Sequence, residues 1–230
     1  MASYYDLSYG FDEDCFHPFG FPFFRNVQHF ASHGCRHAFA TFSLHTATHI
    51  DAPWHMVRDG RRLDQVPLQE LIGRAVALDL SEHYGPETPP SRGISAEHLQ
   101  ARLEKNNLSL EAGDALIVYT GRAPLFLSDP SRYYEEYCTL DEGASQWAAD
   151  RGVRLIGIDA PDIDLRTEYT EQPFRAGNHR FLLGRGIYII ENVGGEITRV
   201  LDKSFELIPA PLKVQGEFAS GAPVRLIGRL

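Results

Sequence analysis

The stretch from His45 to His55 constrains this chain more than any other. It reads HTATHIDAPWH and holds three histidines and one aspartate within eleven residues. The residues between them are small or β-branched, which favours an extended strand. His45, His49 and Asp51 occupy odd positions, so their side chains point to one face of such a strand. Because imidazole and carboxylate groups bind zinc and manganese, this pattern predicts a metal site.

The spacing of these side chains sets a condition on that site. A flat strand would separate the Cα atoms of His45 and His49 by about 13 Å. We therefore expect either a bend or bulge in the strand, or two metal ions that share the cluster. Pro53 ends the extended run, and His55 follows on a turn. The alternative interpretation is a histidine-rich surface loop or an ordinary half-buried strand.

Composition limits the kinds of protein that this chain can be. With 230 residues, 43% of them hydrophobic and 23% charged, it has the balance of one folded domain, residues 1–230. The net charge of −9 argues against a nucleic-acid partner, because phosphate contacts need clustered lysine and arginine. Cys15, Cys35 and Cys138 show no C-x-x-C spacing, so we expect reduced thiols in a cytoplasmic protein.

The sequence gives no indication of export or membrane insertion. Residues 1–10 contain neither a basic start nor an apolar run, so we expect no signal peptide. No window approaches eighteen uninterrupted apolar residues, so we expect no membrane contact through a spanning helix.

Apolar runs alternate with helical patterns along the chain. Buried strands are predicted at 74–81, 115–121, 153–158 and 187–190. Helices are predicted at 95–105, where Ser95 is the expected N-cap, and at 140–152. This alternation predicts an α/β fold with a mixed sheet, and no repeat or linker divides the chain.

Aromatic residues gather near the N-terminus. Residues 15–24 read CFHPFGFPFF, which is too rich in proline and glycine for a helix. Phe21, Phe24 and also Trp54 are candidates for contact with an aromatic or apolar substrate. Alternatively, the aromatic segment packs on the core or on a second subunit. The following histidines, at 29, 33 and 37, are interpreted as part of a loop near the site.

Two further segments contain acidic groups next to buried strands. GIDAPDID, residues 157–164, follows a predicted strand, so Asp159, Asp162 and Asp164 are candidates for supporting contacts to a site or for turn formation. Glu191 follows four apolar residues and must be solvated, paired or metal-bound. His179 lies on a short predicted helix that Asn178 can cap.

These segments resemble a known family. HTATHIDAPWH is similar to the H-x-G-T-H-x-D-x-P-x-H signature of the cyclase family of metal-dependent hydrolases, with Ala47 at the usual glycine position. GDALIVYTG resembles the family's G-D-x-x-x-x-x-T-G segment, and GIDAPDID its G-x-D-A-x-S-x-D segment, with Asp162 in place of serine. His179 and Glu191 match its H-x-x-L-L…I-x-x-x-E pattern. The family includes bacterial kynurenine formamidases and isatin hydrolases.

The resemblance implies a structure and an assembly. The expected fold is a swivelling β/β/α domain, and the expected assembly is a homodimer or larger, with the aromatic N-terminal loop reaching towards the partner's site. One or two ions of zinc or manganese per subunit would be bound by five residues: His45, His49, Asp51, His179 and Glu191.

The resemblance also implies a reaction. We expect hydrolysis of an amide, cyclic amide or ester bond in a small aromatic substrate, as in an arylformamidase, by metal-activated water with His55 as general base and acid. The alternatives are a polyketide-type cyclase, a lactone or lactam hydrolase, or a metal-binding protein without catalysis. A serine-hydrolase interpretation is disfavoured because the chain has no G-x-S-x-G motif.

Overall fold

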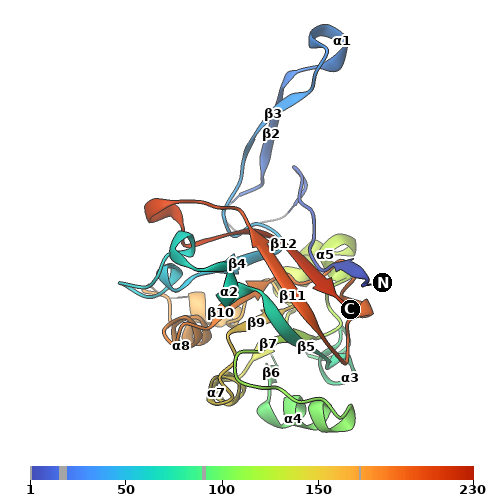
Figure 1. Ribbon diagram of the computed structural model, residues 1–230, viewed down its shortest axis with the longest axis vertical. Helices are drawn as coiled ribbons and strands as arrows, with labels where there is room; N and C mark the ends of the chain where they lie inside the picture. Colours follow the sequence, from blue (N-terminus) through green and yellow to red (C-terminus); the bar gives the residue numbers. More distant parts are fainter. Residues whose placement is uncertain (1, 16–19, 90–91, 171) are drawn as a thin grey trace.

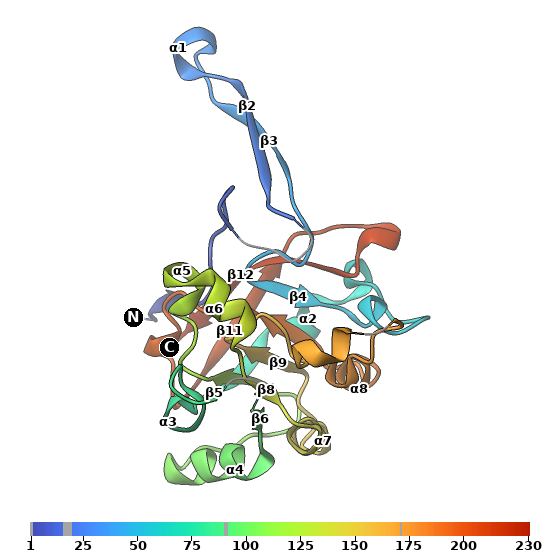
Figure 2. The same cartoon turned by 180° about the vertical axis from the view of Figure 1, so that it is seen from behind.

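A computed structural model describes residues 2–15, 20–89, 92–170 and 172–230. Its main element is an eight-stranded mixed sheet in the order β1-β12-β11-β5-β7-β9-β10-β4 (Figures 1 and 2). The strands are β1 Tyr4–Asp6, β4 His49–Asp51, β5 Gly73–Asp79, β7 Ala115–Tyr119, β9 Leu155–Ile158, β10 Tyr188–Glu191, β11 Lys203–Pro211 and β12 Gly221–Arg229. Strand β4 also pairs with β12, so seven of the strands close into a barrel-like ring. The predicted α/β fold with a mixed sheet is confirmed.

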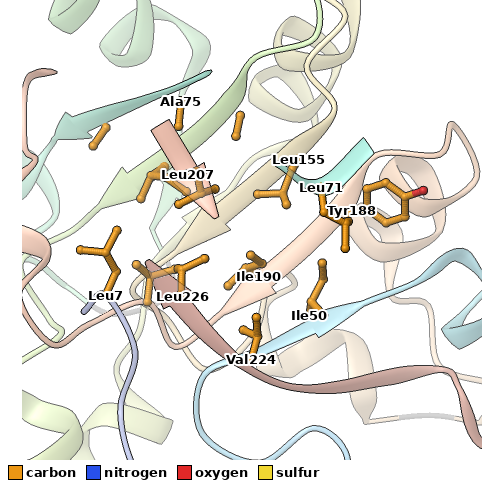
Figure 3. Packing of buried hydrophobic residues seen from close by; sticks show 14 of the residues in the cluster. Leu7, Ile50, Leu71, Ala75, Leu155, Tyr188, Ile190, Leu207, Val224 and Leu226 are labelled. Atoms are coloured by element: carbon orange, nitrogen blue, oxygen red, sulfur yellow. The ribbon is translucent and has the colours of Figure 1, made fainter. Parts of the chain in front are cut away.

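Strands β5, β7, β9 and β10 are parallel and buried on both faces. Their side chains alternate between two apolar clusters, as the two-residue period of a strand requires. Ala75, Leu155 and Ile190 point into one cluster, which Figure 3 shows against strands β4 and β12. Val76 and Ile156 point into the other cluster, under the helices. All four predicted strands are therefore present.

Helices cover the second cluster. α4 Ala96–Lys105, α7 Glu142–Asp150 and α8 Gly177–Leu183 contribute buried side chains such as Leu99 and Leu182 to it (Figure 1). Ser95 caps α4 as predicted, because its hydroxyl accepts a hydrogen bond from the His98 N–H. The assignment of residues 1–230 to one domain stays a prediction.

Short helices, turns and a small strand pair connect the strands of the sheet and the helices that cover it. They are α2 Leu68–Leu71, α3 Ser81–Tyr84, α5 Leu125–Ser128, α6 Pro130–Glu135, a two-stranded pair of β6 Gly93–Ile94 with β8 Thr139–Leu140, and the 3-10 turns η1 Pro53–His55, η2 Leu63–Gln65, η3 Arg166–Tyr169, η4 Ile197–Arg199 and η5 Gly216–Phe218. No helix among the described residues is long and apolar enough to cross a bilayer.

A two-stranded arm projects from the body (Figures 1 and 2). Strands β2 Phe23–Gln28 and β3 His37–Thr41 form an antiparallel ribbon, with the short helix α1 Phe30–His33 at its tip. The prediction that the histidines at 29, 33 and 37 belong to a loop near the site is therefore wrong, because they lie on this arm. Gly34, with φ of 70°, turns the chain back into β3, so these histidines do not share one helix.

Candidate metal centre

The chain bends immediately before β4, which is one of the two arrangements expected from the spacing of the histidines. Ala47 adopts a left-handed φ of 52°, a conformation that favours glycine and costs an alanine about 1 kcal/mol. The Asn192 side-chain amide donates to the Ala47 carbonyl at 2.8 Å and holds this turn. The bend brings His45 back towards the strand, with its Nδ1 2.7 Å from Asp51 Oδ1.

Strand register brings the second predicted ligand segment to the first. Glu191 is the cross-strand partner of His49, and the His49 Nε2 lies 3.3 Å from Glu191 Oε2. The other ring nitrogen, Nδ1, donates to the Ala47 carbonyl at 2.9 Å. A carbonyl only accepts, so Nδ1 has the proton and Nε2 directs a lone pair towards the acidic cluster.

On its other edge, β4 pairs with the start of β12, where Gly221 faces Asp51. A Cβ on Gly221 would lie 2.8 Å from His45 Cε1 and 2.6 Å from the Ile50 carbonyl oxygen. Only glycine permits this close approach, so β12 forms one wall of the cluster.

His179 on α8 completes the cluster from the helical side. Its Nε2 lies 3.2 Å from Asp51 Oδ2 and 3.4 Å from Glu191 Oε1. Its Nδ1 lies 2.7 Å from Asp164 Oδ2, and the same carboxylate accepts the backbone N–H groups of Asn178 and His179. Asp164 therefore caps α8 and orients the imidazole at once.

The predicted cap is corrected accordingly. Asn178 lies within α8, and its side-chain amide donates to the carbonyls of Leu140 and Ile163. The helix N-terminus is capped by a carboxylate distant in sequence, which a search for a local capping residue does not find.

The pKa values of several residues in the cluster are strongly shifted. Burial raises the pKa of Glu191 to about 8, and the nearby Asp51 adds to this effect. Burial also opposes ionisation of Asp51, but the histidines around it, at positions 45, 55, 49 and 179, hold its pKa well below the usual range. For His179, hydrogen bonds to Asp164 and Asp51 outweigh burial and raise its pKa well above the usual value.

These residues fit a divalent metal ion. Asp51 Oδ1 is buried and accepts no hydrogen bond from the described residues, although it lies against two imidazoles. A buried carboxylate oxygen needs a partner, and a cation supplies one. The ligand atoms within each of three groups lie within 4.8 Å of one another: His45–Asp51–His55, His49–Asp51–Glu191 and Asp162–His179–Glu191. All are nitrogen or oxygen donors, as zinc or manganese would accept.

His55 lies beside this cluster on η1. Its ring centroid is 4.2 Å from that of His45 and 5.5 Å from that of His179. Burial lowers the pKa of His55 to about 3 despite the opposing charge of Asp51. The imidazole is therefore neutral at neutral pH, with an unprotonated ring nitrogen, although a pKa this low makes it a weak base in the metal-free protein.

A cavity of about 550 Å³ opens onto the cluster. Four imidazoles and Glu191 line it, and much of the remaining lining is apolar or aromatic. The wall residues include Met56, Tyr134, Tyr137, Pro161, Tyr169 and Phe174. This size and lining suit a small aromatic molecule. No periodic pattern in residues 131–138 or 161–174 identified these side chains in the sequence.

The predicted aromatic contacts lie elsewhere. Trp54 donates its Nε1–H to the Glu217 carbonyl at 3.0 Å and does not line the cavity. Phe21 is 63% exposed, and Phe24 lies on β2 of the arm, with its ring 6.2 Å from that of Phe11. Neither phenylalanine lines the cavity of its own protomer. Residues 16–19 of the aromatic segment lie outside the described residues.

The three predicted supporting aspartates, Asp159, Asp162 and Asp164, differ in their contacts. Asp162 Oδ1 accepts the Tyr169 hydroxyl at 3.1 Å and lies 3.8 Å from His179 Nδ1. Asp159 contacts none of the candidate ligands. Its buried carboxylate instead accepts the backbone N–H groups of four consecutive residues, 120–123. Asp164, rather than Asp159 or Asp162, is the aspartate that forms the hydrogen bond to His179 Nδ1.

Comparison with known proteins agrees with these features. A family model described as "Putative cyclase" matches residues 5–165. A kynurenine formamidase of Bacillus mycoides is 30% identical over 192 residues, covering 82% of this chain and 78% of the relative. A kynurenine formamidase of Bacillus cereus gives the same identity and coverage.

Solved structures share the fold. An isatin hydrolase bound to the product analogue thioisatinate superposes with a TM-score of 0.87 at 16% identity, covering 100% of this chain and 92% of that chain. Isatin hydrolase A from Labrenzia aggregata gives 0.84 at 19% identity, covering 100% and 94%. The family model and the formamidase relatives together show that the chain belongs to the cyclase family.

Proposed function

We propose that this protein hydrolyses the carbon–nitrogen bond of an aryl amide, most closely an aryl formamide, at a divalent metal centre. Family membership and the kynurenine formamidase relatives make it a hydrolase of amide bonds. The observation that supports a metal centre best is the convergence of buried imidazole and carboxylate groups around Asp51, whose Oδ1 accepts no hydrogen bond from the described residues.

The proposed ligands are the five residues of the two sequence motifs: His45, His49, Asp51, His179 and Glu191. When bound, a zinc or manganese ion would supply Lewis acidity, which polarises a carbonyl and lowers the pKa of water towards about 7. Asp164 fixes the His179 ring, and the Ala47 carbonyl fixes that of His49, so both Nε2 atoms face the centre before any ion arrives.

His55 is the proposed general base and acid. Its neutral imidazole lies on the cavity wall beside His45 and His179, within reach of a group held at the cluster. It would accept the proton of the attacking water and return it to the leaving nitrogen. The aromatic ring of the substrate would pack among Tyr134, Tyr137 and Phe174, which orients the amide towards the cluster.

Assay of a small substrate panel tests this function. The protein, with its metal content measured by elemental mass spectrometry, is incubated with N-formylkynurenine, formanilide, isatin and a small lactam. We expect formate release from the formamides, with activity proportional to bound zinc or manganese. Carbon–carbon bond closure without hydrolysis, or no turnover in a metal-loaded sample, would contradict the proposal.

We also propose that the protein works as a homodimer in which the arm contacts the second copy. All five side chains of β3 are exposed, and Phe23, Phe30 and Phe39 are each at least 58% exposed. An isolated two-stranded ribbon is only marginally stable in water, so this arm needs a partner surface. A second copy is the occupant expected from the family resemblance.

A further inference from the structure

One arginine faces the cavity without a role in the proposed chemistry. Among the described residues that line the cavity, Arg166 is the one arginine or lysine. The other charged side chains of the lining are acidic or imidazole groups, such as Glu135, Asp162 and Glu191. Arg166 is therefore the one permanently cationic side chain among the described residues of a lining that otherwise offers imidazole, carboxylate, hydroxyl, amide and aromatic groups.

The local backbone explains why Arg166 faces the cavity. It begins the 3-10 turn η3, which ends at Tyr169. Residues three apart eclipse one another in a 3-10 helix, so Arg166 and Tyr169 share one face. The Tyr169 hydroxyl donates to Asp162 on the cavity wall, which fixes the direction of that face.

The guanidinium is available to a ligand. The ion-pair partner recorded for it is Glu135, at 3.9 Å between Nη1 and Oε1, and the two side chains are 68% and 62% exposed. Such an exposed, long ion pair contributes little and is readily exchanged. Its position nevertheless shows that a carboxylate fits beside Arg166 at the cavity mouth.

The charge of Arg166 also acts on the aromatic wall. Burial raises the pKa of Tyr137 far above the usual value, and Arg166 opposes that rise. Tyr137 lines the same cavity as Arg166 and the candidate metal ligands. A substrate ring packed on Tyr137 would therefore lie within reach of the charge of the guanidinium.

We propose that Arg166 is a specificity-determining residue that binds a carboxylate on the substrate, remote from the amide bond that is cleaved. This inference rests on the proposed amide hydrolase function and narrows its substrate class to aryl amides with an acidic side chain. Arginine suits this task because its planar fork can donate two parallel hydrogen bonds to one carboxylate. Without substrate, Arg166 pairs with Glu135, and the carboxylate of the substrate displaces Glu135 on binding.

Two matched pairs of compounds test the inference. For turnover, the pair is ortho-formamidophenylpropanoate and its primary amide, which differ only in charge. For binding without turnover, the pair is phenylpropanoate and phenylpropanamide, measured by titration calorimetry. Both pairs are compared in the natural chain, Arg166→Gln, Arg166→Lys and Glu135→Gln. Arg175→Gln is the control, because Arg175 is similarly exposed on the same segment and pairs with Glu142 away from the cavity.

We expect the natural chain to prefer the carboxylate of each pair by roughly tenfold, mainly through KM. Arg166→Gln should reduce this ratio towards one, Arg166→Lys should keep part of it, and Arg175→Gln should keep all of it. Glu135→Gln should increase it, because the competing carboxylate is removed. A ratio near one in the natural chain, or an equal loss in Arg175→Gln, would overturn the inference.

The two pairs separate failure of the inference from failure of the proposed function. If both formamides are cleaved with no preference that depends on Arg166, the hydrolase function stands and the inference is overturned. If neither formamide is cleaved, the hydrolase function fails, and the calorimetric ratio still decides whether Arg166 binds a carboxylate.

Discussion

Glu191 and His49 are direct cross-strand partners, and their side chains meet at 3.3 Å between Oε2 and Nε2. The pairing of β10 with β4 thus unites two motifs that are far apart in the sequence. Side chains alternate along a strand, so a slip of one residue would turn Glu191 away from His49. The geometry of the candidate metal centre therefore depends on the register of this one strand pair.

Replacing His49 with alanine should remove the bound metal. The loss of one nitrogen ligand leaves Asp51 and Glu191 as adjacent carboxylates, and we expect at least a hundredfold weaker metal binding with loss of amide hydrolysis. Elemental mass spectrometry after dialysis measures the metal. His83→Ala is the control, because His83 is 42% exposed and pairs with Glu82 outside the cluster. Full metal occupancy in His49→Ala would contradict the proposed ligand set.

His55→Gln should separate metal binding from catalysis. Glutamine keeps much of the volume of the side chain but cannot take up a proton, so we expect kcat to fall about 10²- to 10⁴-fold with the metal content preserved. Steady-state kinetics and elemental analysis of one sample give both values. Trp54→Phe, next in the chain but outside the cavity lining, should keep kcat within about threefold of the natural value. Equal activity of His55→Gln and the natural chain would exclude His55 as the base.

Metal affinity should rise with pH. Without metal, burial raises the pKa of Glu191 to about 8, and hydrogen bonds raise that of His179 well above its usual value. Below pH 8 an incoming ion must displace protons from these groups, so affinity falls as pH falls, by up to tenfold per unit for each proton displaced.

Competition titrations with a chelator between pH 6 and pH 9 measure this dependence, after correction for the chelator's own protonation. Calorimetry in two buffers of different ionisation enthalpy should show proton release on metal binding at pH 7. An affinity that does not change between pH 6 and pH 8 would contradict protonation of Glu191 and His179 in the metal-free protein.

Arg122 should be essential for stability although it is remote from the metal ligands. Its guanidinium is 1% exposed and donates to the carbonyls of Tyr84, Gly85, Thr88 and Glu136. Arg122→Leu would leave these acceptors without donors, and we expect a loss of about 3 kcal/mol in the free energy of unfolding. Urea denaturation measures this. The exposed Arg199→Ala should change the same quantity by less than about 0.5 kcal/mol.

The arm should determine the oligomeric state. Phe39 pairs with Arg25 across the ribbon, so Phe23 lies diagonally from Phe39 on the same face. Changing both phenylalanines to serine should convert the expected dimer to a monomer, as measured by light scattering at micromolar concentration. Asn26→Ser, on the opposite face, is the control. A natural chain that is monomeric at this concentration would refute the dimer.

The buried strands and the cluster of His45, His49 and Asp51 could be predicted because both have a local signal. His179 and Glu191 were assigned as candidate ligands only through the resemblance to the family, and the bend at Ala47 is one of the two arrangements that the spacing of His45 and His49 allowed. Asp164 was predicted as a supporting or turn-forming residue, but its partner was not, because the contact with His179 depends on the placement of α8 against the sheet.

The arm and the cavity walls could not be predicted for a related reason. Histidines four residues apart are compatible with a helix face, and only the pairing of β2 with β3 shows that the chain reverses between them. Tyr137 and Tyr169 line one cavity because the segments after α6 and β9 converge in space. Convergence of this kind leaves no periodic trace in a single sequence.

The double pairing of β4 has a consequence for how the protein is made. One edge of β4, which contains His49 and Asp51, pairs with β10 and the other edge pairs with β12. Strand β12 follows β4 by more than 160 residues in the sequence. On the ribosome, His49 and Asp51 therefore emerge early but gain their final neighbours only after nearly all of the described chain has been synthesised. The barrel-like ring and the candidate metal centre become complete in the same late step. The histidines of a nascent chain would therefore be exposed long before they could bind an ion together.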